Sequence, residues 1–240
     1  MRARWTRLLV VLAAGLSSAL ATDPPSSALN PVSGFIEVVD TTLSGQHWHV
    51  RHVANPGNGH LREVTVLTAG NGDDAAPQIA ISPAGGTWVT WWTAGPVDQV
   101  YYRRRTSPDG AWSTAALIGD AQTSARKPAI AFDGATPWFA WEIGASPSRS
   151  IVAAQGGAND PEPMPSWTVL AQTGSNAELN LMLHAEAGHL WVTWEDGALR
   201  VGWCELDHGT GHWGAASFDS YAADDTAHSL ARIRAAVLGL

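Results

Sequence analysis

The stretch Trp88-Val89-Thr90-Trp91-Trp92 decides the fold, because two close copies of it follow at intervals of about fifty residues. The copies are Trp138-Phe139-Ala140-Trp141-Glu142 and Trp191-Val192-Thr193-Trp194-Glu195. Each has a short apolar segment before it, at 77–81, 128–132 or 179–183, and two strand-like runs after it. The repeating unit therefore contains four strands, with Gly- and Pro-bearing turns between them.

Four short strands per repeat are typical of a blade of a β-propeller. Successive side chains of a strand point to opposite faces, so Trp88, Thr90 and Trp92 share one face while Val89 and Trp91 share the other. A strand that is apolar on both faces suits a sheet packed between two other sheets. The predicted fold class is all-β, a β-propeller of four-stranded antiparallel blades.

The two ends of the chain are predicted to complete one blade between them. Residues 35–40, 47–53 and 62–68 read as the second, third and fourth strands of a blade without a first strand. Residues 226–233 follow the last blade at the spacing of a first strand. We expect four blades, closed by pairing of this C-terminal strand with the N-terminal blade, which hides both sheet edges. The alternative is a fragment of a larger propeller.

Residues 1–21 are typical of a secretory signal peptide, with basic Arg2, Arg4 and Arg7, an apolar run and a small-residue ending at Ala21. Residues 22–34 are expected to be an N-terminal linker, and residues 35–240 the propeller domain. The apolar run is shorter than the roughly 20 residues of a membrane helix. We therefore predict a secreted or periplasmic protein without a membrane span.

The charge and the cysteine content narrow the classes of function. The formal net charge of -8 argues against nucleic acid as a partner. The single cysteine, Cys204, has no partner for an intrachain disulfide and is expected to be a buried thiol. Two histidine pairs, His47 with His49 and His208 with His212, lack an evident third ligand, so no metal site is assigned to them.

Ser107-Pro108-Asp109-Gly110-Ala111-Trp112 lies where the third strand of its repeat turns into the fourth. Pro presets the turn, Asp caps it and Gly relieves its backbone. The segment resembles the Asp-box, or BNR, repeat of sialidase-like propellers, with a shorter spacing between Asp and Trp. Asp207–Trp213 and Asp160 with Ser166-Trp167 are looser copies.

In the sialidase-like superfamily the Asp box is structural and lies opposite the catalytic face, so the resemblance implies the propeller fold more than an activity. An arginine triad needs arginines that converge from different blades. Arg103-Arg104-Arg105 is contiguous instead, and it is expected to be a solvated strand near the blade edge.

The ligand is expected on the propeller face where the second strand of each blade ends and the first strand begins. Strand ends place Asp40, Trp92, Glu142 and Glu195 there, and the loops before the first strands add Asp74 and Lys127. Carboxylates around a funnel can hold sugar hydroxyls, with Trp92 as a stacking platform, or a Ca²⁺ ion through oxygen ligands. These six residues are predicted to bind the ligand. No catalytic residue, metal ligand or other cofactor is assigned.

The leading hypothesis for function is a secreted binding module that recognises a glycan or another extracellular ligand. One alternative is a sialidase-like glycoside hydrolase or lyase that uses two of these carboxylates as acid and base. A third hypothesis is a protein-interaction scaffold whose partner is an extracellular protein. Binding is favoured over catalysis, because no stretch carries a specific catalytic signature.

Overall fold

The computed structural model describes residues 25–55, 63–145, 148–157, 167–173, 180–196, 200–220 and 233–238. Blade 1 contains β1 (Ser26–Leu29), β2 (Ile36–Ser44), β3 (His47–Asn55) and β4 (Glu63–Val66), and blade 2 contains β5 (Asp74–Ile81), β6 (Thr87–Thr93), β7 (Gln99–Arg105) and β8 (Ala116–Ile118). Blade 3 contains β9 (Ala125–Asp133), β10 (Thr136–Ala145), β11 (Ser148–Gln155) and β12 (Thr168–Thr173). Blade 4 contains β13 (Met182–Glu186), β14 (His189–Asp196), β15 (Arg200–Asp207) and β16 (His212–Trp213), with β17 (Ser217–Ser220) also paired to β15.

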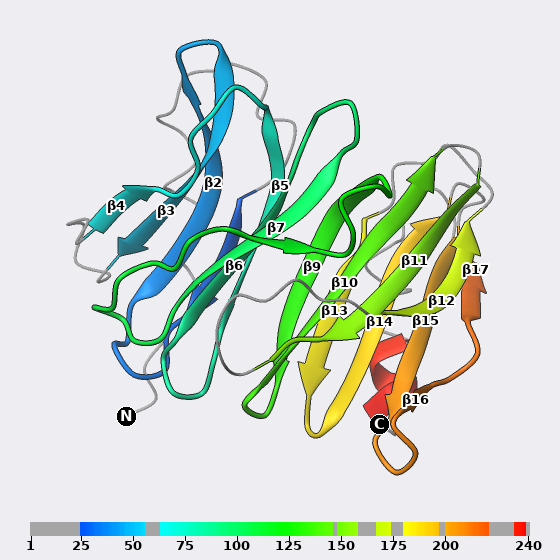
Figure 1. The fold of residues 1–240 in the computed structure, drawn as a ribbon. Helices are drawn as coiled ribbons and strands as arrows, with labels where there is room; N and C mark the ends of the chain where they lie inside the picture. The colour runs from blue at the N-terminus through cyan, green and yellow to red at the C-terminus, as the bar shows by residue number, and fades with distance from the viewer. Residues whose placement is uncertain are drawn as a thin grey trace, which may run out of the picture.

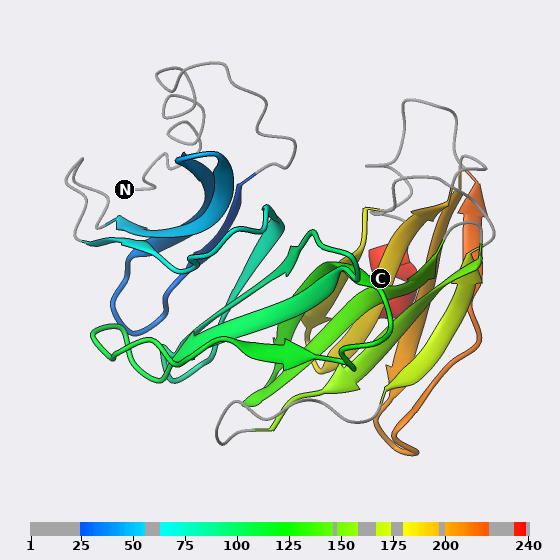
Figure 2. The same ribbon diagram turned by 45° about the horizontal axis from the view of Figure 1, so that its top comes forward.

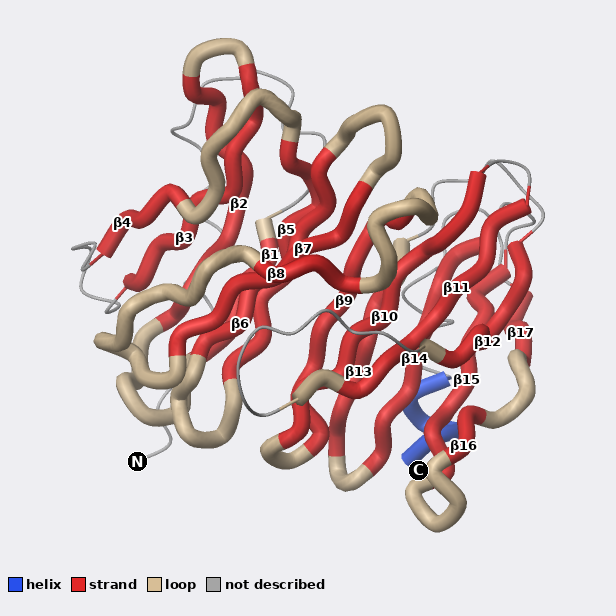
Figure 3. The backbone as a smooth tube through the Cα atoms, in the orientation of Figure 1, coloured by secondary structure: helices blue, strands red, loops and turns tan. Residues whose placement is uncertain are grey.

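The predicted fold class is confirmed, because the described chain is nearly all β and its four sheets are antiparallel blades. The blades follow one another side by side in chain order, and blades 1 and 4 lie at opposite ends of the row (Figures 1 and 2). Figure 3 shows the same row as a backbone tube, with one short helix at residues 233–238.

The alternation predicted for the Trp-rich strand is also confirmed. Trp88 packs with Phe139 and Trp141 in the core between blades 2 and 3. Val89 and Trp91 pack with blade 1 instead. The core between blades 3 and 4 is centred on Trp194, which is 1% exposed. Each blade thus buries an apolar layer against its neighbour.

The tryptophans at the start of the fourth strands link neighbouring elements. Trp112 makes an edge contact with His52 of blade 1, with ring centroids 5.1 Å apart. Trp213 contacts Trp138 of blade 3 at 5.9 Å. Trp112 and Trp213 therefore each anchor their blade to the preceding one.

The predicted source of the first strand of blade 1 is wrong. That strand is β1, which lies within the segment 22–34 expected to be a linker and pairs with β2 from Leu29↔Ile36 to Ser26↔Val39. The turn between them is fixed by Asn30, whose side-chain oxygen accepts hydrogen bonds from the backbone amides of Val32 and Ser33. A local hairpin closes a much shorter loop than pairing of the two chain ends would, so its entropic cost is smaller.

The C-terminal segment forms a helix on blade 4 rather than a strand on blade 1. Residues 226–232 of the predicted strand lie outside the described residues, and Ile233 begins the helix 233–238. Ile233 and Val237 pack on Trp191 and Val201. Arg234, an awkward residue for an innermost strand, is at the surface in an ion pair with Glu186. The helix therefore covers the face of blade 4 that is turned away from blade 3.

A buried polar cluster joins blades 1 and 2. Glu37 is 1% exposed, and its Oε2 accepts hydrogen bonds from His52 Nε2 at 2.8 Å, Thr87 Oγ1 at 2.8 Å and Arg105 Nη2 at 3.0 Å. Asn30 donates to Oε1 at 2.7 Å. Burial alone would raise the pKa of Glu37, but these donors and the Arg105 charge lower it to about 2. The carboxylate is therefore held ionised inside the protein.

The prediction that the arginine run is solvated is wrong for Arg105. This residue is 2% exposed, and it pairs with Glu63 at 2.6 Å as well as with Glu37. Arg103 donates to the Leu67 carbonyl, and Arg104 lies over the Trp88 ring at 5.1 Å. Arg103 and Arg105 thus contact blade 1, while Arg104 lies over β6 of its own blade. Cys204 is 1% exposed, as predicted, and burial raises the pKa of its thiol to about 12.

Candidate functional site

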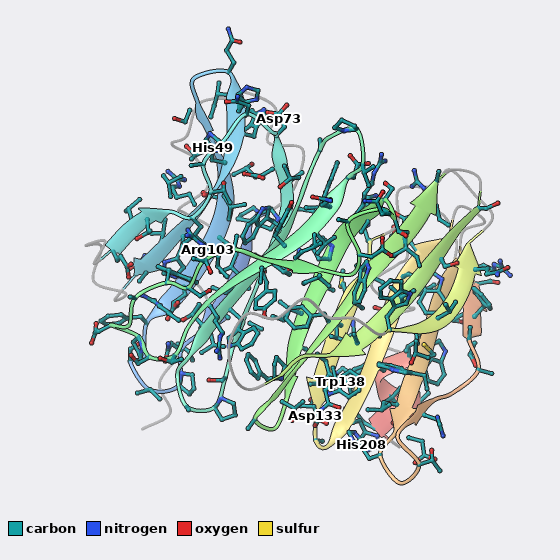
Figure 4. All side chains as sticks on the ribbon, viewed as in Figure 1. His49, Asp73, Arg103, Asp133, Trp138 and His208 are labelled. Carbon is teal, nitrogen blue, oxygen red and sulfur yellow. The ribbon has the colours of Figure 1, made fainter. Side chains whose placement is uncertain are left out.

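One end of the blades carries the β2–β3 and β6–β7 connections and the segments that enter β5 and β9; we call it the loop face. In Figure 4, His49 and Asp73 mark this face at the upper end, while Asp133, Trp138 and His208 lie at the opposite end. The predicted site residues can be placed against this face one junction at a time.

The junction of blades 2 and 3 holds a stacked cation. Arg126, from β9, lies over the ring of Trp92, from β6, with the guanidinium carbon 5.4 Å from the ring centroid. Arg126 Nε donates to Asp98 Oδ2 at 2.5 Å. Asp98, which is 6% exposed, also accepts from the Gly95 amide and the Ser124 hydroxyl. The carboxylate and the ring together hold the Arg126 guanidinium in one place.

Lys127, the only lysine of the chain, follows Arg126 in an unusual backbone conformation. Its φ of 49° lies in the left-handed region, which non-glycine residues adopt at a cost of about 1–3 kcal/mol. Lys127 and Pro128 fall in the β-bulge where the β9–β10 register shifts. No described residue pairs with the Lys127 ammonium group. A bulge re-aims side chains, and here it presents a second cation next to Arg126 in the chain.

The same backbone feature occurs one blade earlier without the charge. Ala76 has a φ of 47°, precedes Pro77 and lies in the bulge of the β5–β6 pair. Ala76 is therefore the structural counterpart of Lys127. The strained conformation belongs to both blades, whereas the cation belongs to blade 3 alone.

Glu142 lies on the strand next to this cation and is 2% exposed. It is in register with Arg126 across the β9–β10 pair. Its Oε1 accepts from Arg149 Nη1 at 3.1 Å, but its Oε2 is buried and has no hydrogen-bond partner among the described residues. An unsatisfied buried carboxylate oxygen is unusual in a folded protein and often marks a functional group.

Asp74 is also near the loop face, but both of its oxygens are occupied. It is 6% exposed and accepts from Thr68 Oγ1 at 2.5 Å and Thr93 Oγ1 at 2.6 Å. His49 Nδ1 lies 3.6 Å from the same carboxylate, and the neighbouring Asp73 lies 3.4 Å from His47 Nδ1. These contacts tie the β2–β3 hairpin to blade 2.

Asp40 and Glu195 have other partners, and among the described residues no hydrogen bond or ion pair joins either of them to Arg126 or Lys127. Asp40 forms a two-pronged ion pair with Arg51, at 2.8 and 2.5 Å, on the face of blade 1 turned away from blade 2. Glu195, at the end of β14, accepts from Asn180 Nδ2 at 2.9 Å. Three of the six predicted ligand residues are linked to Arg126: Trp92 by its ring, Lys127 as the next residue in the chain, and Glu142 by strand register.

Sequence reasoning left out Asp98 and Arg149, which fix Arg126 and Glu142. Asp98 follows a Gly-Pro turn and Arg149 begins a strand, so neither stood out in the repeat pattern. The expected ring of carboxylates is not assembled. Within the described ranges, no three His, Cys, Asp or Glu residues come together as a metal site, and no helix has the length and hydropathy of a membrane span.

No protein-family model and no curated protein sequence matches the chain. Solved structures do match. They include the Hadza microbial sialidase Hz136 (12% identity, TM-score 0.57, 80% of this chain and 45% of that one) and a NanB sialidase from Streptococcus pneumoniae (7%, 0.55, 82% and 51%). A xylan beta-1,4-xylosidase from Bacillus halodurans also matches (13%, 0.54, 82% and 42%).

The chain shares the β-propeller fold of these glycoside hydrolases. It spans about half of their length, between 42% and 51%. At identities of 7–13% the likeness shows the fold alone. The sialidase-like propeller predicted from the sequence is thus supported as an architecture, without specific support for Asp-box repeats.

Proposed function

We propose that the protein binds a glycan on the loop face at the junction of blades 2 and 3. The observation that carries this proposal is the pair of adjacent cations on β9: Arg126 is fixed by Trp92 and Asp98, and Lys127 is left without a partner among the described residues. Two positioned donors beside one another suit the hydroxyl or carboxylate oxygens of a sugar.

The role of Trp92 in this proposal differs from that of a bare stacking platform. The Arg126 guanidinium lies over the ring of Trp92, and the ring packs into the core between blades 2 and 3. Trp92 therefore positions Arg126, and the donors meet the ligand. The glycoside hydrolases of the same fold, a xylosidase and sialidases by name, make a glycan the first ligand class to test.

Replacing Lys127 with glycine is expected to weaken glycan binding and to stabilise the fold. Loss of a charged hydrogen bond lowers affinity by roughly tenfold to a hundredfold. Glycine adopts the left-handed conformation freely, so the free energy of unfolding should rise by up to about 1 kcal/mol. Calorimetric titration with neutral and acidic oligosaccharides, together with urea unfolding, measures both effects.

Ala76→Gly is the matched control for this variant, since Ala76 has the same backbone conformation and no charge. It should give a similar gain in stability and leave the affinity unchanged. Equal affinity of the wild type and Lys127→Gly for every oligosaccharide that binds would rule out the proposed contact.

Hydrolysis of a glycoside is a second candidate function, favoured by the buried Oε2 of Glu142, which has no hydrogen-bond partner within the described ranges. This oxygen is available to donate a proton to a glycosidic oxygen or to accept one from water. A second carboxylate would be required for either stereochemical course. Arg149, bound to Oε1, would keep the group in place.

If Glu142 serves as the acid or base, Glu142→Gln should lower turnover of aryl glycosides by about 10²–10⁴-fold while affinity changes little. The measurement is steady-state release of the chromophore across a panel of such substrates. Glu186→Gln, which changes an exposed carboxylate paired with Arg234 and not counted among the predicted site residues, is the control and should retain full activity. Wild-type protein that binds sugars without releasing any product would leave binding as the function.

A further inference from the structure

The outer face of blade 1, turned away from blade 2, is apolar and open. Leu29 is 66% exposed, Ile36 42%, Val64 52% and Val66 50%. The strand register makes these side chains neighbours, because Leu29 pairs with Ile36 while Val53 links Val38 to Val64. Four strands therefore present one continuous apolar surface, of a kind that usually marks an interaction site.

The outer face of blade 4, at the other end of the row, is covered. On blade 4 the corresponding face carries Trp191 and Val201, which are 2% and 0% exposed because the helix 233–238 covers them. No described residue covers blade 1 in this way. A head-to-tail stack, with blade 4 of one copy on blade 1 of another, is blocked by that helix.

The charge of the blade 1 face also favours self-association. Its charged pair, Asp40 and Arg51, is neutral as a whole, although the chain has a net charge of -8. Two copies can therefore meet here without the repulsion expected between other surfaces of an acidic protein. A twofold arrangement also lets Arg51 of each copy approach Asp40 of the other.

We propose that the outer face of blade 1 binds the same face of a second copy, to form a twofold-symmetric dimer. The interface is isologous because the one face that could accept blade 1 in a head-to-tail manner is already occupied by the helix. The inference is independent of the glycan site, which lies at the junction of blades 2 and 3.

Sedimentation velocity and light scattering on the full chain test the dimer over about a hundredfold range of concentration. The fraction of dimer, and with it the average mass, rises with concentration. The wild type should show the mass of two chains at the upper end of the range. Val66→Lys and Leu29→Glu, on β4 and β1, should each show the mass of one chain with unchanged circular dichroism.

Val169→Lys is the matched control, because Val169 is a similarly exposed valine, at 53%, on β12 of blade 3. It should keep the mass of two chains. A wild-type mass of one chain at every concentration would overturn the proposal and indicate that the face is covered within the chain or by a different protein. Dimers that persist in both Val66→Lys and Leu29→Glu would overturn it equally.

Discussion

Replacing Trp194 with alanine is expected to lower the free energy of unfolding by about 3–5 kcal/mol, the range for a fully buried large aromatic side chain. Trp194 is 1% exposed and lies at the centre of the core between blades 3 and 4. The ring lies so close to Gly202 that a Cβ there would stand 2.3 Å from it. Neighbouring side chains cannot easily fill the space that such a ring leaves, so a cavity remains.

Trp194→Phe is the control for this prediction. The indole Nε1 is buried and has no hydrogen-bond partner in the described part of the chain, so phenylalanine loses volume but none of the hydrogen bonds described. The loss of stability should therefore be well below that of Trp194→Ala. Urea unfolding monitored by circular dichroism compares the three proteins. Equal losses for Phe and Ala would mean that the indole contributes something other than packing.

The second large effect is a loss of stability in acid that depends on Glu37. Its pKa is about 2 in the folded protein against an ordinary value of 4.5, so its ionised form stabilises the fold above pH 4.5. This stabilisation, on the order of 3 kcal/mol, disappears as the pH falls from 4.5 to 2. Unfolding in urea at a series of pH values measures the slope.

Glu37→Gln should be less stable at neutral pH and should lose most of this slope. Glu186→Gln changes an exposed carboxylate whose pKa is lowered by a surface ion pair with Arg234; because solvent screens this pair, the slope should change much less than in Glu37→Gln. An unchanged slope in Glu37→Gln would assign the acid sensitivity to other carboxylates.

The blades could be predicted from the sequence because each repeat carries its own evidence. The alternation of Trp88 and Val89 fixes which side chain faces which neighbour, and this needs no knowledge of distant residues. By contrast, β1 is only four residues long and is followed directly by Asn30 and Pro31, so it gives too short a pattern to recognise. The first strand was consequently sought at the wrong end of the chain.

The contacts between polar side chains could not be predicted from the sequence, for a different reason. Glu37 and Arg105 are 68 residues apart, and nothing in the local sequence of either indicates the other. The repeat did predict that Trp92 and Glu142 occupy equivalent positions in their blades, and the strand register shows this; their binding of a ligand stays a prediction. Which carboxylates are occupied depends on contacts between blades, such as that of Asp74 with Thr68.

The bulge shared by Ala76 and Lys127 shows that the backbone conformation is independent of the side chain that it carries. Blade 2 keeps the costly conformation although alanine offers nothing to a ligand there. The conformation therefore belongs to the backbone of blades 2 and 3 and does not require the charge. In each of these two blades, a single substitution at the bulge position changes the side chain presented on the loop face. New specificities can thus arise in this architecture without any rebuilding of the backbone.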